Sequence, residues 1–280
     1  MQEAESPKYA IGGGSFSIQL MKRKGVTAMP RPHSHRSIEL YYLISGERIY
    51  FIEDQVVTVR EGDLIVIAPG ELHATASSQV AEFERFLLHV EPEFLDPSLS
   101  VEPLLAPSGR FRLIRLSFKE QDEVRRLLAQ MQDECRLGRL HYELCVRSLL
   151  AELLILLHRI EPQRAEPADR HPLFAKISEI ATYLREHARE PLTLEATANR
   201  FYISASYLSR IFYRFTGFHF REYVTVVRIR EAQRLLAETQ LQVQEVAGKM
   251  GFEHMSHFNR TFKRIAGITP LQYRKRSARD

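Results

Sequence analysis

Four side chains in the N-terminal part of the chain could coordinate a metal ion or bind a polar small molecule. His33, His35 and Glu39 all have odd numbers, so an extended strand would place them on one face. His73 follows a Pro-Gly turn and offers a fourth donor atom. Imidazole and carboxylate groups are ligands for divalent transition metals. The same groups could instead contact an effector or satisfy the backbone of nearby turns.

Two tyrosines lie close to these residues in the sequence. Tyr41 and Tyr50 could stack on a sugar ring or simply belong to the core. We expect no bound metal, no other cofactor and no catalytic residue. Catalysis would also need a substrate cavity and an open coordination position, and the sequence shows neither. We assign effector binding to His33, His35, Glu39, Tyr41 and His73.

A second group of residues lies near the C-terminus, where one helical pattern is written twice about 50 residues apart. Two helices joined by a short turn form a helix-turn-helix, whose second helix enters the major groove of DNA. Ala198 aligns with Ala247 only if the second turn carries one extra residue. The matched pairs are Leu208 with Phe258, Arg210 with Arg260, Phe212 with Phe262, Gly217 with Gly267 and Tyr223 with Tyr273.

The outward face of each second helix carries side chains of types that could read DNA. Arginine can contact guanine in a bidentate manner, asparagine can pair with adenine, and serine suits several base edges. Lys263 is better suited to a phosphate. A solvated surface position is the alternative for a single serine or histidine, whereas the matched Arg210 and Arg260 favour DNA contact. We assign DNA binding to Ser206, Ser209, Arg210, Arg214, Ser256, His257, Asn259, Arg260 and Lys263.

Charge is distributed unevenly along the 280 residues. The whole chain has a formal net charge of +4, with 44% hydrophobic and 26% charged residues, which is ordinary for a globular protein. Residues 172–280 hold 18 lysines and arginines against 10 acidic residues, a net of +8, which leaves −4 for residues 1–171. Positive charge therefore gathers where the repeat lies, as a phosphate-binding surface requires.

Composition also argues against some classes of protein. The longest apolar stretch, Leu149–Leu157, contains Glu152 and is too short to span a membrane, so we expect a cytoplasmic protein. The two cysteines, Cys135 and Cys145, both fall in predicted helices, which indicates neither a disulfide framework nor a cysteine metal site.

The elements follow from the periodicity. Short extended runs separated by polar turns fill residues 16–90 and predict a small antiparallel barrel or sandwich, preceded by a glycine-rich tail at 12–14 that is either untethered or an arm over the pocket. Apolar residues at helical spacing predict two helices within 118–160, broken near Leu137-Gly138. The second, His141 to Ile160, is apolar around much of its circumference and is a candidate dimer interface.

Residues 161–172 contain three prolines and no apolar period, which predicts a linker. We therefore expect an effector-binding and dimerisation domain at 1–160 and a DNA-binding domain at 173–280. Within the latter, a helix over Phe220–Glu238 would span roughly 28 Å at 1.5 Å per residue. That length would hold the two reading units about one DNA turn apart.

The region from about 174 to 275 resembles the AraC/XylS family of transcription regulators. The motifs that carry the resemblance are Leu192-Thr193-Leu194-Glu195, Ser206 through Phe212, Arg228-Ile229, Gly251-Phe252, and Gly267-Ile268-Thr269-Pro270 with Tyr273-Arg274. The resemblance implies double-stranded promoter DNA and RNA polymerase as partners, usually with activation of transcription. Tyr202 stands where the family often has a turn glycine, so we expect the first turn to differ in geometry.

The N-terminal histidines carry a second resemblance. The spacing His33-x-His35-x3-Glu39-x6-Gly46 is similar to the first cupin motif, and Gly62 through His73 is similar to the second. The barrels of AraC/XylS regulators are also cupin-like and often carry such histidines without known chemistry.

We therefore predict an α+β multidomain protein with a cupin-like β-barrel, two dimerisation helices and an all-α domain with two helix-turn-helix motifs. It would be a homodimeric regulator, not an enzyme, controlled by a small metabolite such as a sugar. A cupin-type metalloprotein or metal enzyme fused to a DNA-binding domain is one alternative. A DNA-binding protein that needs no ligand is another.

Overall fold

The computed structural model of the chain divides into two compact units, Met1–His171 and Pro172–Asp280. It describes residues 7–25, 29, 32–52, 54–78, 80, 82–97, 111–160 and 172–277. The linker predicted at 161–172 lies outside these ranges except for its last residue, Pro172. Within the same ranges, no helix is long and apolar enough to cross a membrane.

The N-terminal unit is built on two antiparallel sheets. The larger sheet has the order β1 (Lys8–Ile11), β2 (Phe16–Lys24), β8 (Glu82–Val90), β3 (Ile38–Ser45), β6 (Asp63–Ile67) and β9 (Phe111–Arg115). The smaller sheet has the order β5 (Gln55–Arg60), β4 (Glu47–Ile52) and β7 (His73–Ser77). The two sheets face each other across a buried cluster, and together they form the predicted barrel.

Strand alternation separates two layers of core on the faces of the larger sheet. On β8, Phe83 points between the sheets, where it packs with Tyr41 and Tyr50. Phe86 and Leu88 of the same strand point to the opposite face and pack against helices. One set of alternate side chains therefore faces the interior of the barrel, and only that set can form an enclosed site.

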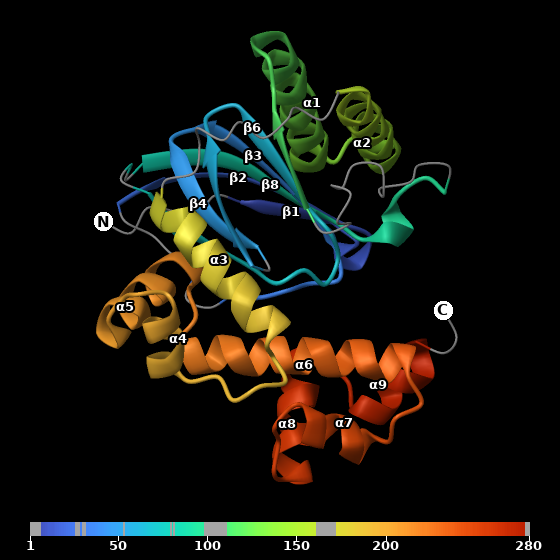
Figure 1. Cartoon of the computed structure of the whole chain (residues 1–280). Helices are drawn as coiled ribbons and strands as arrows, with labels where there is room; N and C mark the ends of the chain where they lie inside the picture. The colour runs from blue at the N-terminus through green and yellow to red at the C-terminus, as the bar shows by residue number, and fades with distance from the viewer. Residues whose placement is uncertain are drawn as a thin grey trace. The chain divides into compact units, whose positions relative to one another are not determined.

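Helices α1 (Phe118–Leu137) and α2 (Tyr142–Arg159) cover the outer face of the larger sheet (Figure 1). The α1 helix begins at Ser117, whose side chain accepts a hydrogen bond from the backbone amide of Glu120. It ends at Gly138, which adopts a left-handed conformation with φ 57°. The predicted break near Leu137-Gly138 is confirmed, because only glycine takes this conformation without steric cost.

The N-terminal segment differs from the prediction of an untethered tail. Lys8–Ile11 pairs with β2 as an edge strand of the larger sheet, in the register Ile11 to Phe16. Gly12–Gly14 forms one 3-10 turn between these strands. The short strand escaped prediction because the adjacent glycines dominate the local sequence, while its pairing depends on a strand that follows them.

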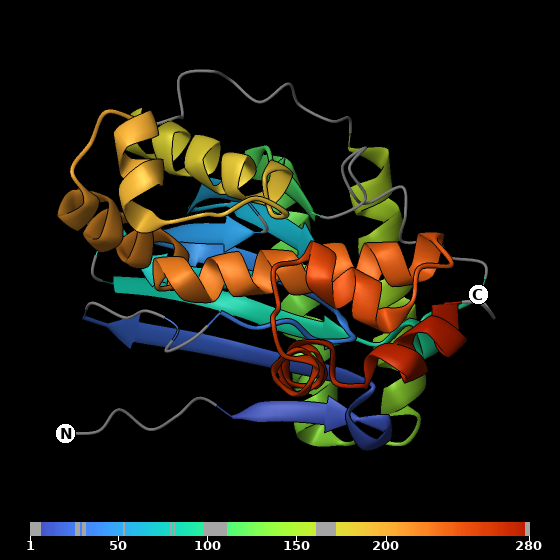
Figure 2. The ribbon, with the colours of Figure 1, turned by 60° about the horizontal axis from the view of Figure 1, so that its bottom comes forward.

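The C-terminal unit contains helices and no strand among its described residues. Its helices are α3 (Pro172–Glu186), α4 (Leu194–Arg200), α5 (Ala205–Thr216), α6 (Phe220–Glu238), α7 (Val243–Lys249), α8 (Met255–Ala266) and α9 (Pro270–Ser277). Figures 1 and 2 both show α6 as one continuous helix, with α4 and α5 toward one end and α7 to α9 toward the other. The predicted pair of helix-turn-helix units joined by a long helix is confirmed.

The first helix-turn-helix keeps the geometry of the second despite its bulky turn residue. Tyr202 has φ 57°, and Gly251 in the equivalent place has φ 71°. In the first turn the amide of Ile203 donates to the carbonyl of Ala198 at 3.0 Å. In the second turn the amide of Phe252 donates to the carbonyl of Ala247, also at 3.0 Å. The expectation that Tyr202 changes the turn is therefore wrong. The Tyr202 side chain is 95% exposed and clashes with no neighbouring residue. The free-energy cost of the left-handed conformation is therefore confined to the backbone of Tyr202.

The second turn is longer by one residue, as the alignment of the copies requires. Helix α5 begins three residues after Tyr202, whereas α8 begins four residues after Gly251. The extra residue therefore lies between the left-handed position and the start of the second helix.

Candidate functional site

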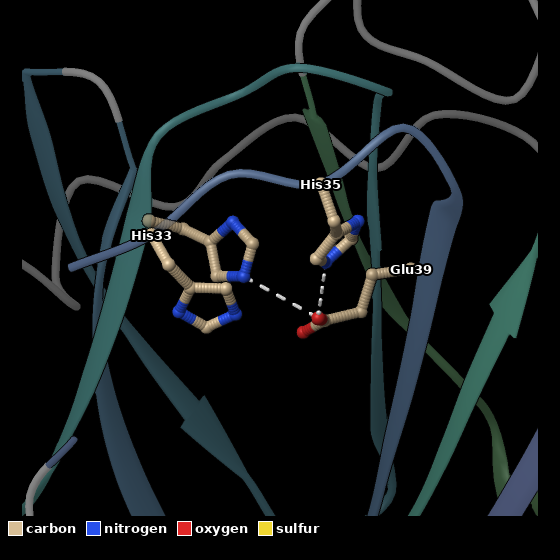
Figure 3. A group of neighbouring side chains, drawn as sticks. His33, His35 and Glu39 are labelled. Carbon is tan, nitrogen blue, oxygen red and sulfur yellow. Dashed lines mark hydrogen bonds and ion pairs between the residues drawn. The ribbon is translucent and has the colours of Figure 1, made fainter. Parts of the chain in front are cut away.

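The structure brings together four of the five predicted effector residues at one end of the barrel. The ligand atoms of His33, His35, Glu39 and His73 all lie within 4.8 Å of one another. Figure 3 shows His33, His35 and Glu39 turned toward a common point. The fifth residue, Tyr41, lies deeper between the sheets.

The residues meet by a different route from the one predicted. Of the three residues predicted to share one strand, only Glu39 lies in a strand, β3, while His33 and His35 lie in the segment before it. The backbones of His33 and His73 form an antiparallel bridge in which each amide donates to the other carbonyl at 3.0 Å. This bridge, and not a shared strand face, brings His33 beside the start of β7.

Exposure falls steeply from the mouth of this site inward. His33 is exposed, and the side chain of His35 is 20% exposed. Glu39 and His73 are 1% and 0% exposed. The cluster therefore opens to solvent at its histidine end and leads into the barrel.

Backbone contacts determine which nitrogens of two histidines face the carboxylate. His35 Nδ1 lies 2.8 Å from the Ser37 carbonyl, and His73 Nδ1 lies 3.0 Å from the Glu71 carbonyl. Because a carbonyl only accepts, each Nδ1 is assigned as the donor. The two Nε2 atoms then face Glu39 Oε2 at 3.0 and 3.3 Å.

This arrangement requires positive charge at the centre of the cluster. A neutral imidazole with its proton on Nδ1 would present an Nε2 lone pair to a carboxylate oxygen, which is repulsive. His73 Nε2 is buried and has no well-aligned hydrogen-bond partner among the described residues. Either a protonated ring or a bound cation relieves the repulsion.

The electrostatics of the pair agree with this conclusion. Burial acts to raise the pKa of the Glu39 carboxyl, but the charge of the nearby His73 and the hydrogen bond from His35 bring it well below the ordinary value. Burial acts to lower the pKa of His73, but Glu39 outweighs it and the net shift is upward. Glu39 is therefore a carboxylate at neutral pH.

The four residues fit a divalent transition metal. Three imidazoles and one carboxylate suit zinc, iron, nickel or copper. Metal-binding histidines commonly donate their second ring nitrogen to a backbone carbonyl, as His35 and His73 do here. His33, His35, Glu39 and His73 would hold such an ion, which would supply the positive charge that Glu39 faces. The expectation of a metal-free site remains a prediction.

The interior beyond this cluster contains polar side chains that the sequence analysis missed. The ring of His89 on β8 lies 4.6 Å from the ring of His35. Arg85 on the same strand is 8% exposed, and Arg48 on β4 is 3% exposed. Phe83, Arg85, Leu87 and His89 alternate along β8 and share one face, but the local sequence does not indicate that this face points inward.

The predicted DNA-binding residues lie on α5 and α8, as expected. Their buried faces hold Leu208, Phe212, Phe258 and Phe262. Ser209 is half-buried, and the remaining predicted contacts are exposed: Ser206, Arg210, Arg214, Ser256, His257, Asn259, Arg260 and Lys263. An exposed face opposite a packed face is the geometry that a recognition helix needs.

The cations on this face differ from others in the same unit. Arg189 and Arg234 both pair with Glu231, which takes them out of consideration as phosphate ligands. Within the described residues, no carboxylate lies at ion-pair distance from Arg210, Arg214, Arg260 or Lys263. These four positive charges are available to DNA.

A polar site enclosed in a barrel, on one chain with two helix-turn-helix units, defines a DNA-binding protein with a separate ligand-binding domain. Comparison with known families agrees with this class. Residues 26–158 match the AraC-like ligand binding domain, and residues 197–276 match the helix-turn-helix domain of the same type of regulator. The chain belongs to the AraC/XylS family of transcription regulators.

Curated relatives span most of the chain. It is 27% identical over 252 residues to the HTH-type transcriptional activator RhaR of Enterobacter sp. (strain 638), covering 88% of this chain and 87% of the relative. It is 24% identical over 260 residues to the melibiose operon regulatory protein of Escherichia coli (strain K12), covering 89% and 85%. It is 26% identical over 249 residues to the HTH-type transcriptional regulator YfiF of Bacillus subtilis (strain 168), covering 86% and 78%.

Proposed function

We propose that this transcription regulator changes its affinity for promoter DNA when a small polar metabolite binds in the N-terminal barrel. The observation that carries the proposal is the cluster of His33, His35, Glu39 and His73, which opens to solvent at one end and is buried at the other. A surface histidine cluster would not need to be enclosed. A site for an effector does, because enclosure excludes water from polar contacts.

Two relatives support a sugar-related effector and activation of transcription. One is named as a transcriptional activator, and another is named for the melibiose operon. No relative described above is named as an enzyme, so the alternative of a metal enzyme has no support from these comparisons. We place the protein in the cytoplasm, with RNA polymerase as its partner at the promoter.

Each helix-turn-helix would insert its second helix in a major groove. Arg210 and Arg260 are proposed to read guanine, and Asn259 adenine, while Lys263 holds a phosphate. Helix α6 has 19 residues and would span roughly 28 Å, close to the pitch of one turn of DNA. One chain would thus contact two successive grooves.

Helix α2 is proposed as the dimer interface. One side packs on the sheet through Val146, Leu150 and Leu153. The other side leaves Leu144 and Ile155 exposed, by 63% and 37%. With Ser148 and Ala151 they follow a spacing of four, three and four residues, which is the seam pattern of a coiled coil. A second copy of α2 would cover these side chains.

The effector would act by favouring one arrangement of the barrel and the helical unit over another. Such a ligand has an effect only through different affinities for the two arrangements. Binding of the effector to the barrel would therefore have to change the positions that the two DNA-binding units of the dimer can adopt.

The test is selection of genomic DNA fragments by the purified full-length protein, with and without a pool of metabolites. Tandem sites upstream of an uptake or catabolic operon, with enrichment that depends on the pool, would support the proposal. Recovery of no specific sequence, together with stoichiometric zinc, iron or manganese in the purified protein, would overturn it in favour of the metalloprotein alternative.

A further inference from the structure

The interior of the barrel contains a buried cation with only neutral partners. Arg85 lies on β8, points between the sheets and is 8% exposed. Its guanidinium donates to the carbonyl and the side-chain oxygen of Gln19 at 3.4 and 3.3 Å, and to Met21 Sδ at 3.6 Å. Among the described residues, no carboxylate lies at ion-pair distance. A buried charge without a carboxylate in direct contact is costly, so this one calls for an explanation.

A structural role for Arg85 is the first explanation to compare. Arg112 is equally buried, at 9% exposure, and it donates to the carbonyl of Ile160 at 2.7 Å, which ties β9 to the end of α2. The contacts of Arg85 are all at the long end of the hydrogen-bond range. The contacts of Arg85 within the protein are therefore weak, which is expected of a side chain whose main partner is a ligand.

The hydroxyl of Tyr41 is unsatisfied in the same part of the interior. Tyr41 is 2% exposed, and its hydroxyl has no hydrogen-bond partner among the described residues. The guanidinium carbon of Arg85 lies 5.8 Å from the centre of the Tyr41 ring. The Tyr41 hydroxyl and the Arg85 guanidinium can both donate hydrogen bonds, so a single acceptor group placed between them could bind both.

Surrounding charges make the interior positive at this depth. Arg48 is 3% exposed and interacts electrostatically with Arg85, and burial lowers the pKa of both guanidiniums. The buried carboxylate of Glu39 contacts His35 and His73, two residues closer to the mouth along β3 than Tyr41. An anion between Tyr41 and Arg85 would be attracted by these two cations, against the weaker opposing influence of Glu39, which interacts electrostatically with Tyr41 and Arg85 but contacts neither.

We propose that the effector is a small organic acid whose carboxylate is bound by Arg85 and the hydroxyl of Tyr41. This inference rests on the proposed function and specifies its ligand as a sugar acid in place of a neutral sugar. Arginine matches a carboxylate with two parallel N–H donors, and a tyrosine hydroxyl adds a third. The hydroxyl groups of the acid would extend toward Glu39 and the histidines, which bind polar groups at the mouth.

The test compares the full-length protein with two variants. The thermal midpoint is measured in sodium acetate, galacturonate, glucuronate and gluconate, each against sodium chloride of equal ionic strength, and in neutral galactose and glucose. We expect the acids to raise the midpoint of the wild type and the neutral sugars to leave it unchanged. Tyr41→Phe should keep the fold and weaken acid binding about tenfold.

Arg85→Met separates a ligand role from a structural one. The variant keeps an apolar stem but removes the charge, so we expect the ligand-free protein to become more stable, with the response to acids lost. Arg112→Met is the control: it should lower the midpoint and leave the response intact. If Arg85→Met instead lowers the midpoint as Arg112→Met does, and no acid exceeds chloride, Arg85 is structural and the inference is wrong.

The outcomes also separate this inference from the proposed function. A shift with neutral sugars that Arg85→Met leaves unchanged would contradict the acid and keep the sugar effector. A shift with acids that changes no DNA affinity would keep the anion site and contradict effector control.

Discussion

At the scale of single residues, two of the exposed cations of α8 are proposed to have different chemical roles. Arg260 and Lys263 are both exposed and free of carboxylate partners among the described residues, but only a guanidinium can pair with guanine in a bidentate manner. The two side chains should therefore respond differently to removal.

Arg260→Ala is expected to lower binding to the specific site by about 1–3 kcal/mol and to relax preference at one base position. Lys263→Ala should weaken all sequences about equally and reduce the salt dependence by about one counterion. Competition binding at several salt concentrations measures both effects. Equal weakening of all sequences by Arg260→Ala would make Arg260 a phosphate contact.

The left-handed backbone conformation of Tyr202 has a free-energy cost that Gly251, its counterpart in the second turn, does not have. A non-glycine residue in the left-handed region costs roughly 1–2 kcal/mol. Tyr202→Gly is expected to raise the free energy of unfolding by about 1 kcal/mol, since glycine's larger chain entropy offsets part of the gain. Urea unfolding of the full chain, followed by far-UV circular dichroism, measures the change.

Gly251 provides the matched control for this turn. It has the same left-handed conformation, and an added Cβ would lie 3.1 Å from Arg228 Nη1. Gly251→Ala should therefore destabilise the helical unit by about 1 kcal/mol or more. A loss of stability in Tyr202→Gly would show that the tyrosine side chain makes a contact worth more than its strain.

The histidine cluster predicts a response to metal ions. Zinc at neutral pH should raise the thermal midpoint, because His35 and His73 direct unprotonated Nε2 atoms toward Glu39 when their rings are neutral. His73→Ala should remove most of the response. His158→Ala, outside the cluster, should retain it. If zinc, nickel and manganese all leave the wild type unchanged, the cluster is charged by protons and the metal-free expectation stands.

At the scale of elements, helix α2 is the part whose surface is least explained by a single chain. Leu144→Glu is expected to convert a dimer to a monomer, because it places a charge in the exposed seam with Ile155. Sedimentation velocity measures the change in mass. Phe118→Glu is the control, since Phe118 is 87% exposed and lies on α1. If both variants remain dimeric, another surface forms the interface.

The elements themselves were largely predictable from local patterns. Helix α6 runs from Phe220 to Glu238 as predicted, because caps and apolar spacing both act within a few residues. Strands β3 to β6 also lie where the short extended runs between polar turns indicate them. The edge strand Lys8–Ile11 was missed, since four residues carry little pattern and pairing is decided by β2.

The site was predictable in composition but not in geometry. The spacing of His33, His35 and Glu39 identified the cluster, yet its closure depends on the bridge between His33 and His73, which are far apart in the sequence. Arg85 and His89 required knowledge of which face of β8 points inward. That face is set by neighbouring strands, and no local pattern determines it.

At the scale of the whole molecule, function depends on how many grooves one assembly occupies. Each chain carries two recognition helices joined through α6, so a dimer carries four. A monomer would have half the contacts of the dimer and should bind with lower affinity. The proposed dimer would therefore need two half-sites whose phase along DNA matches the geometry of its two chains.

This requirement predicts a dependence on helical phase. Inserting about five base pairs, half a turn of DNA, between two tandem half-sites should abolish cooperative binding, because it rotates one half-site to the opposite face. Inserting about ten base pairs should restore part of it. Gel-shift titration of the full-length protein measures the affinities, and Leu144→Glu should be insensitive to both insertions. Equal binding of the wild type to all three spacings would show that each chain binds DNA independently, and dimerisation would then have no part in selecting the site.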